Sequence, residues 1–406
     1  MKPQRPALEV ADIFREHGLA YRLTRPLSPE QRRVMQAIEQ CRTAALGGHV
    51  QQCDACAYQQ IAYNSCRNRH CPKCQSLARA RWLKARLADL LPVEYFHVVF
   101  TLPEPLAPLA LQNQRLVYNL LFATAARTLQ TIAADPKHLG AELGFLAVLH
   151  TWSQTLRHHP HLHCVIPGGG LAPDQQRWLS CRPGFFLPVK VLSRLFRRLF
   201  LSALARAFTQ QQLKCYGSLL HLAQPAAFQH FLNSLRRREW IVYAKPPFGG
   251  PAQVLAYLGR YTHRVAISNQ RLHSCKNGQV TFSWKDYRSQ QTSLMTLNAE
   301  EFIRRFLLHV LPRGFQRLRQ FGFLCNRQRR HKLARCRELL ATASPPQLND
   351  CLYSQPNTTA ASWLQCPVCQ LGTMRLTTRL LPPPPLPNQA FWQATSTPAC
   401  QIFDSS

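Results

Sequence analysis

The chain has 406 residues, with 50 Lys or Arg against 19 Asp or Glu, so its formal net charge is +31 at pH 7. This length allows two or three domains with substantial cores, and a hydrophobic content of 46% is ordinary for a folded protein. No apolar run near the start resembles a signal peptide, and every later stretch of membrane-spanning length is interrupted by charges. These features argue against a secreted or membrane protein and predict a cytoplasmic location.

The charge surplus predicts a polyanionic partner, because such a protein concentrates polyanions around itself. A basic protein of the membrane surface would share the charge, but the chain offers no long basic amphipathic helix separate from its folded segments. Nucleic acid is therefore the expected partner. The 16 cysteines are expected to be free thiols or metal ligands, because a reducing compartment disfavours disulfides.

Residues 1–92 are predicted to form an N-terminal helix and a small domain like a zinc ribbon. Ser28 caps the helix in the pattern of a capping box with Gln31, Pro29 fits its first turn, and the glycines at 47–48 end it. A cysteine-rich stretch follows, and the apolar spacing then predicts a second helix over 75–91.

The cysteine-rich stretch contains two Cys-x-x-Cys pairs, separated by the fourteen residues 57–70. Four thiolates in two such pairs fill a tetrahedral zinc and leave no open position, which is typical of a structural site. The expected ligands are Cys53, Cys56, Cys71 and Cys74, and either Cys66 or His70 could replace one of them.

Basic residues surround this predicted zinc site, so the small domain is expected to contact DNA phosphates. The alternative is a folding element whose basic face is simply solvated. The basic residues expected to contact DNA here are Arg67, Arg69 and Lys73.

Residues 93–290 alternate strand-like and helical patterns in an order that predicts an α+β domain with a central, mainly antiparallel sheet flanked by helices. A Pro-rich turn at 246–251 precedes a helix that contains two tyrosines. The expected strands are 95–102, 144–152, 161–166, 240–244, 265–268 and 279–284, and the expected helices are 106–133, 189–210 and 226–236.

Residues 291–340 are predicted to be a basic helical extension of that domain, with Asn298 and Glu301 capping a helix that ends near Pro312. Residues 301–340 contain eleven Lys or Arg and two Glu, so their arginines have few carboxylates to pair with. The interleaved phenylalanines are expected to belong to the core. The arginines expected to contact DNA phosphates are Arg304, Arg305, Arg313, Arg317 and Arg319.

The tail, residues 341–406, is rich in Pro, Ser and Thr and is expected to be extended or disordered. It contains one more Cys-x-x-Cys pair, Cys366 and Cys369, which is half of a zinc site. Cys336, Cys351 or Cys400 could complete it, but no second knuckle is visible, so a single zinc is the favoured interpretation.

Two patterns point to chemistry. In His161-Leu162-His163 a strand would project both imidazoles to one face, where they could hold a divalent metal, and Leu162 to the other. Tyr257 and Tyr261 stand one helical turn apart. Each pattern has a plainer interpretation, a polar strand face or core tyrosines, but together in a strongly basic chain they suggest cleavage of a phosphodiester by tyrosine.

That reaction needs a metal to neutralise and orient the phosphate, and Mg²⁺ or Mn²⁺ is the expected ion. It leaves a covalent phosphotyrosine and a free 3′ hydroxyl, so no nucleotide cofactor is required. The sequence agrees, because it contains no GxxxxGK[ST] phosphate loop.

The chain resembles the HUH endonucleases in three motifs that occur in the family's order. These are Phe100-Thr101-Leu102, His161-Leu162-His163 and the YxxxY of Tyr257 and Tyr261. Longer strings are similar to the rolling-circle insertion-sequence transposases of the two-tyrosine class, which have an N-terminal zinc-binding domain. These strings lie at 64–74, 149–152 and 260–267, and the resemblance covers roughly residues 1–340.

The resemblance implies an HUH-type catalytic domain and a transposase that nicks one strand at a single-stranded transposon end. Tyr257 or Tyr261 would hold the 5′ phosphate, and the strand would pass to target DNA by alternating the two. His161 and His163 would be ligands of the catalytic ion, the four cysteines named above would hold zinc, and Arg260 and Arg264 beside the tyrosines would contact DNA. The third ligand of the catalytic ion stays open among His97, His150 and Gln154.

Two alternatives share parts of this pattern. A plasmid replication initiator or relaxase would use the same chemistry at an origin, and a zinc-dependent DNA-binding regulator would bind without cleaving. The sequence does not specify the end and target sequences, the order in which the tyrosines act, or the oligomeric state.

Overall fold

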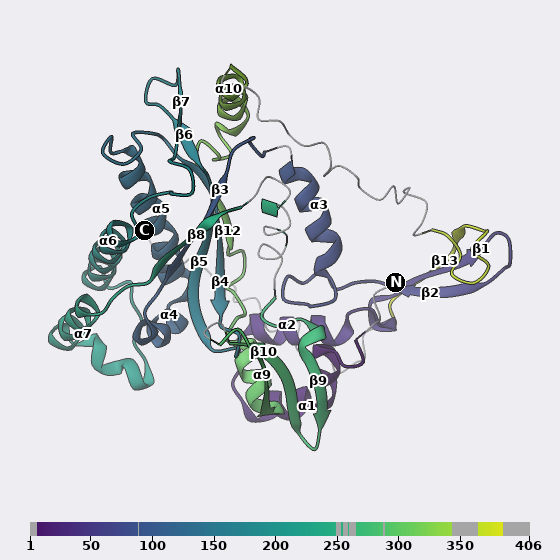
Figure 1. Ribbon diagram of the computed structural model, residues 1–406. Helices are drawn as coiled ribbons and strands as arrows, with labels where there is room; N and C mark the ends of the chain where they lie inside the picture. The colour runs from purple at the N-terminus through teal and green to yellow at the C-terminus, as the bar shows by residue number, and fades with distance from the viewer. Residues whose placement is uncertain are drawn as a thin grey trace, which may run out of the picture.

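A computed structural model describes residues 6–87, 89–248, 253–254, 259, 265–286, 289–342 and 364–384 (Figure 1). Its centre is a five-stranded sheet in the order β12-β4-β5-β3-β8, in which every neighbouring pair is antiparallel. This arrangement confirms the α+β class and the mainly antiparallel sheet. The strands are β3 (Tyr95–Thr101), β4 (Gly144–Trp152), β5 (His158–Pro167), β8 (Val242–Phe248) and β12 (Leu318–Gly322).

Helices cover one face of this sheet and form the main core with it (Figure 1). Because side chains alternate along a strand, Phe96, Phe100 and Leu162 all point to this face, and all three are buried. The helices are α4 (Ala107–Gln112), α5 (Gln114–Ala134), α6 (Val189–Thr209) and α7 (Pro225–Arg237).

The opposite face of the sheet lies under α3 (Gln75–Leu87), on the other side of the sheet in Figure 1. A smaller apolar cluster forms there from Leu146, Val148 and Val165 of the sheet, with Leu83 of α3 packed against it. The sheet thus separates a large apolar core from a face with room for polar side chains.

A second core joins the N-terminus to a later part of the chain. The ring of Phe14 on α1 (Val10–Thr24) lies edge-on against Phe306 on α9 (Ala299–Leu307), with 5.3 Å between centroids. Figure 1 shows these helices beside a second sheet, whose order is β11-β10-β9. Its strands are β9 (Leu272–Lys276), β10 (Gln279–Lys285) and β11 (Thr292–Asn298).

The predicted capping box at the N-terminal helix is confirmed. In α2 (Pro29–Gln40) the backbone nitrogen of Gln31 donates to Ser28 Oγ at 3.2 Å. The backbone nitrogen of Ser28 donates to the side-chain Oε1 of Gln31 at 3.0 Å. The helix ends at residue 40 rather than 47, because a 3₁₀ turn (Ala44–Leu46) and a strand follow. Helix α1, which precedes it, was not predicted.

A third sheet contains strands from both ends of the chain. Strand β1 (Gly48–Cys53) pairs with its neighbour β2 (Gln59–Tyr63) and also with β13 (Met374–Leu380), both antiparallel. Figure 1 shows these strands as a narrow ribbon that projects away from the main sheet. The tail is therefore not wholly extended or disordered, because its residues 364–384 contribute a strand to the N-terminal domain.

The remaining differences are local. The prediction of a strand at 265–268 is wrong, because the chain bends there and enters a 3₁₀ turn (Asn269–Arg271). Strand β8 continues through Pro246 and Pro247, where a turn was predicted, and prolines are tolerated there because β8 is an edge strand. Residues 291–340 are not purely helical, because β12 joins the central sheet.

The other elements are short or peripheral. Asn298 precedes α9, but its side chain does not cap the helix and instead accepts a hydrogen bond from Gln279. Among the described residues no helix combines the length and the apolar composition needed to cross a membrane. The remaining elements are β6 (Gly169–Leu171), β7 (Trp178–Ser180), α10 (Arg329–Thr342), and the 3₁₀ turns Glu104–Leu106 and Gly217–Ala223.

Candidate functional site

Three histidines meet on the polar face of the central sheet. His150 on β4 lies directly opposite His161 on β5, and His163 follows on the same face. One ring nitrogen from each of the three lies within 4.8 Å of the others. Leu162 points into the core on the opposite face, as the strand prediction requires. Three convergent imidazoles are a donor set that holds a divalent metal.

Hydrogen bonds orient two of these rings. His161 Nδ1 lies 2.7 Å from the carbonyl oxygen of His159, so Nδ1 must be the protonated nitrogen and Nε2 has the lone pair. His163 Nδ1 lies 2.8 Å from His97 Nε2 on the neighbouring strand β3. If His163 donates this bond, its lone pair is also on Nε2, which is the tautomer needed for metal binding.

His97 is suited to accept that bond because it is neutral. Its side chain is buried, and burial, with smaller contributions from Lys245 and His161, lowers the pKa of His97 to about 3. His97 was one of the residues considered as third ligand, but it lies outside the group of three converging histidines and contacts His163 as an orienting partner.

His150 is the residue that the structure brings to the predicted pair. Its ring is buried and stacks on Trp152, with 4.6 Å between centroids and 19° between planes. Gln154 lies in the loop after β4, where its backbone carbonyl accepts a hydrogen bond of 2.6 Å from Arg271 Nη2. The sequence offered no signal to choose His150, because its proximity depends on the pairing of β4 with β5.

The first of the three motifs lies directly beside the histidines. Strand β3 pairs with β5 so that Thr101 is opposite His161 and Phe100 is opposite Leu162. Phe100 is fully buried against Phe196 of α6, with 5.0 Å between ring centroids. This motif therefore anchors the strand next to the histidine-bearing face.

Tyr257 and Tyr261, and with them Arg260 and Arg264, lie outside the described residues. Two described residues of the same segment are informative. Val254 is fully buried in the cluster on the histidine-bearing face, and Gly259 is buried against α3. A Cβ on Gly259 would lie 2.8 Å from Leu83 Cδ1 and 2.9 Å from Arg79 Nε, so a larger residue there would require these two side chains to shift.

The predicted zinc ligands do not form one site. Cys71 and Cys74 instead lie with Cys41 and Cys66, and one sulfur from each of the four is within 4.8 Å of the others. Cys74 Sγ is 3.2 Å from Cys41 Sγ and 3.5 Å from Cys66 Sγ. Tetrahedral Zn–S bonds of about 2.3 Å put sulfurs roughly 3.8 Å apart, so these separations suit zinc.

Cys53 ends β1 and Cys56 lies in the turn of the β1–β2 hairpin, so the hairpin carries both away from Cys71 and Cys74. Cys66, the second choice for a ligand, belongs to the cluster. His70 does not, and burial lowers its pKa to about 3. Cys41 was missed, because it stands alone at the end of a helix.

Cys53 and Cys56 lie with Cys366 and Cys369 from the tail. The sulfur of Cys53 is 3.6 Å from that of Cys369, and the sulfur of Cys56 is 3.6 Å from that of Cys366. The cysteine pair of the tail is thus completed by Cys53 and Cys56, and not by one of the three cysteines that the sequence suggested. Of those, Cys336 is buried in a separate apolar cluster, and Cys351 and Cys400 lie outside the described residues.

Several arginines expected to contact DNA have partners within the protein. Arg69 donates to the carbonyl oxygens of Phe315 and Pro312 at 2.5 and 3.1 Å. Arg304 and Arg305 both pair with Glu301 at 2.6 Å. Arg69 thus bonds to carbonyl oxygens distant in sequence, whereas Arg304 and Arg305 bond to a carboxylate one helical turn away.

Two further arginines also serve the fold. Arg319 lies over the ring of Phe122 at 4.2 Å and donates to Asn119 Oδ1 at 2.6 Å. Arg317 is buried, and burial lowers its pKa to about 10. Arg67 and Arg313 are exposed and stay expectations as DNA contacts. The prediction that phenylalanines of this region belong to the core is confirmed for Phe306, Phe315 and Phe323.

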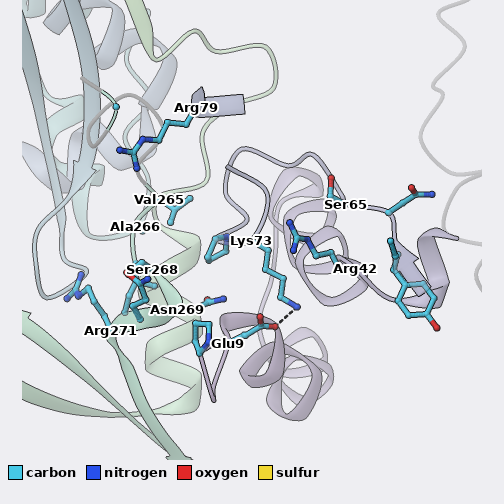
Figure 2. A pocket seen from close by; sticks show the side chains of 18 of the residues that line it. Glu9, Arg42, Ser65, Lys73, Arg79, Val265, Ala266, Ser268, Asn269 and Arg271 are labelled. Carbon is cyan, nitrogen blue, oxygen red and sulfur yellow. Dashed lines mark ion pairs between the residues drawn. The ribbon is translucent and has the colours of Figure 1, made fainter. Parts of the chain in front are cut away.

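A cleft of about 980 Å³ lies between the N-terminal domain and the segment that contains Gly259 (Figure 2). Lys73 lines it, but this ammonium forms an ion pair with Glu9, and both side chains are less than a tenth exposed. Arg42 and Arg79 also line the cleft, and Glu9 is the acidic residue among the lining side chains. Basic side chains therefore outnumber acidic ones among the lining residues of this positively charged cleft.

Comparisons with known proteins agree with this architecture. A family model described as "Putative transposase" matches residues 144–332, and one described as "Transposase zinc-binding domain" matches residues 13–102. The first range includes His150, His161 and His163, and the second includes all four cysteines of the Cys41 cluster. Cys366 and Cys369 lie outside both ranges.

Two relatives extend the match along the chain. "Putative transposase y4qJ" of Sinorhizobium fredii is 60% identical over 376 residues, which cover 90% of this chain and 94% of the relative. "Transposase for insertion sequence element IS801" of Pseudomonas savastanoi pv. phaseolicola is 29% identical over 311 residues, 75% of this chain and 73% of the relative. No solved structure matches the chain.

Proposed function

Because this chain belongs to the insertion-sequence transposases that have an N-terminal zinc-binding domain, we propose that it cleaves and transfers single-stranded transposon ends by tyrosine attack. The observation that supports this chemistry most directly is the convergence of His150, His161 and His163 on one face of the sheet. Val254, three residues before Tyr257, is buried on the same face.

We propose that the three histidines hold a divalent cation that neutralises and orients the scissile phosphate. Imidazole nitrogens suit first-row transition metals better than Mg²⁺, which prefers oxygen ligands. The donor set of three histidines therefore favours Mn²⁺ over Mg²⁺ as the activating ion. His97 has a positioning role, because it fixes the ring of His163.

The nucleophile in this proposal is the phenol of Tyr257 or Tyr261. Its oxygen forms a bond to phosphorus, the bond from phosphorus to the 3′ oxygen breaks, the phenol gives up its proton, and the leaving 3′ oxygen gains one. The 5′ phosphate stays on the tyrosine as an ester. A free 3′ hydroxyl can later attack that ester, so rejoining needs no nucleotide cofactor.

The positively charged cleft is the proposed path of the single strand toward the tyrosines. Gly259, between the two tyrosines in sequence, lines this cleft beside Arg79. Arg42, just after α2, lines the cleft on the side of the N-terminal domain (Figure 2). Both arginines line the cleft and could contact phosphates of one strand, which supports single-stranded DNA as the substrate.

Structural zinc has a direct geometric role in this proposal. Cys41 follows α2, and Cys71 and Cys74 immediately precede α3, so zinc held by these residues and Cys66 would fix the start of α3. Helix α3 packs against both the histidine-bearing face and Gly259. The zinc-binding domain thereby supports the active site from outside.

The test uses single-stranded oligonucleotides from the ends of the insertion sequence, labelled at the 3′ end, with the full-length protein and Mn²⁺. We expect a covalent adduct that survives denaturing electrophoresis and is absent for Tyr257→Phe/Tyr261→Phe. The His161→Ala/His163→Ala variant should lose cleavage but still bind DNA in a salt-dependent manner. An adduct that persists in the double tyrosine variant would show that the nucleophile is wrong, and a wild-type protein that binds without cleaving would favour a regulator.

A further inference from the structure

The N-terminal domain and the tail meet at a second group of four cysteines. Cys53 is the last residue of β1 and Cys56 lies in the turn after it, while Cys366 and Cys369 precede β13, more than 300 residues later. All four sulfurs lie within 4.8 Å of one another. The two measured cross-pair separations are both 3.6 Å, close to the roughly 3.8 Å expected between sulfurs on one zinc and far longer than a disulfide bond of about 2.05 Å.

The backbone around these sulfurs has the hydrogen bonds that thiolate ligands receive. The amide nitrogens of Ala55 and Cys56 each donate to Cys53 Sγ at 3.4 Å. In the other pair, Val368 N donates to Cys366 Sγ and Gly372 N donates to Cys369 Sγ, also at 3.4 Å. Such bonds orient the ligands and stabilise their negative charge.

Close packing explains why position 372 is a glycine. A Cβ on Gly372 would overlap Cys53 Sγ and would lie 2.7 Å from Ala55 Cβ. The two knuckles are further linked by Asp54, which accepts hydrogen bonds from the Thr373 amide at 2.7 Å and from Arg375 Nε at 3.0 Å. The site is therefore built by both segments together.

The sheet at this site has too small a core to be stable alone. Among the described residues, its buried apolar cluster consists of Cys53, Cys366 and Met374, with Cys369 packed against them. Three short strands with so little buried apolar surface need another source of folding free energy. A metal ion held by four thiolates supplies it in small domains of this kind.

We infer that Cys53, Cys56, Cys366 and Cys369 bind a second structural zinc ion, which fastens the tail to the N-terminal domain. The site is closed by four protein ligands, so it is structural and not catalytic. It is separate from the Cys41 cluster and from the three histidines, so it does not depend on the proposed cleavage chemistry.

The first measurement is the zinc content of the full-length protein by inductively coupled plasma mass spectrometry, after removal of loosely bound metal. We expect two zinc ions per chain, and one in Cys366→Ser/Cys369→Ser. The matched control is Cys351→Ser/Cys400→Ser, which changes two other cysteines of the tail. This control should retain two zinc ions per chain. One zinc in the wild type, two in the first variant, or one in the control would each overturn the inference.

The second measurement separates loss of the site from general unfolding. Trypsin should cut at Arg375 and Arg379 of β13 much faster in Cys366→Ser/Cys369→Ser than in the wild type, while the fragments of the central sheet stay protected. Gly372→Ala should give the same cuts and the same loss of one zinc, because its methyl group displaces Cys53. Unchanged protection of β13 in both variants would contradict a zinc that fastens the tail.

Discussion

His97 Nε2 lies 2.8 Å from His163 Nδ1, so a neutral histidine on β3 supports the ring of a proposed metal ligand on β5. The two rings are nearly parallel, with 9° between their planes. His97 belongs to none of the three motifs, yet this contact determines which nitrogen of His163 faces the other two histidines.

His97→Ala should weaken metal binding more than catalysis at saturating metal. The Mn²⁺ concentration for half-maximal cleavage should rise roughly 10- to 100-fold, as is usual when a partner of a metal ligand is removed. His97→Gln should recover most of this loss, because its amide oxygen can accept the bond from His163 Nδ1. A Mn²⁺ titration of oligonucleotide cleavage measures both, and an unchanged midpoint in His97→Ala would remove the positioning role.

His150→Ala should reduce cleavage at least 100-fold and leave single-strand affinity unchanged, because it removes one of three proposed ligands. Gln154→Ala is the control, since both residues were considered as third ligand and Gln154 bonds Arg271 through its backbone carbonyl, which the substitution retains. Single-turnover cleavage rates decide between them. Loss of activity in the Gln154 variant with normal activity in the His150 variant would reverse the assignment.

Arg42→Ala and Arg79→Ala should each weaken binding of single-stranded DNA by removing a phosphate contact in the cleft. Each should reduce the slope of log affinity against log salt by about 0.7, and the double variant by about 1.4. Arg236→Ala is a suitable control, because Arg236 is exposed on α7, bonded to Asn233, on the opposite side of the sheet. Fluorescence anisotropy at several salt concentrations gives the slopes, and equal slopes for all variants would place the DNA elsewhere.

His309 should make the fold sensitive to acid. It is buried, with Nδ1 3.2 Å from Thr151 Oγ1 and Nε2 3.1 Å from the Leu156 carbonyl oxygen. Burial, together with His158, lowers its pKa to about 3. Since this lies below the unfolded value of about 6.5, the unfolded chain takes up the proton first, and stability is lost as pH falls from about 6.5 toward 3.

At pH 5 this protonation of the unfolded chain lowers the free energy of unfolding by about 2 kcal/mol. His309→Gln cannot take up this proton, so its urea midpoint should fall less between pH 7.5 and pH 5 than that of the wild type. Other buried histidines and the cysteine clusters affect both proteins alike, so the difference isolates His309. Parallel pH profiles would show that His309 is not a source of the acid sensitivity.

Patterns with a short period were enough to predict much of the fold. The alternation in His161-Leu162-His163 determined that both imidazoles share a face, and the capping box at Ser28 determined where α2 begins. Both depend on interactions within a few residues, which the sequence specifies directly.

Contacts between distant segments were decided only by the tertiary structure. The pairing of β4 with β5 brings His150 to the histidine pair, and the pairing of β1 with β13 brings Cys366 and Cys369 to Cys53 and Cys56. Sequence spacing favoured the nearest Cys-x-x-Cys pair as partner, but the β1–β2 hairpin holds Cys53 and Cys56 at its turn, away from Cys71 and Cys74. A metal site forms where ligand atoms converge in space, and over hundreds of residues strand register, rather than spacing, determines that convergence.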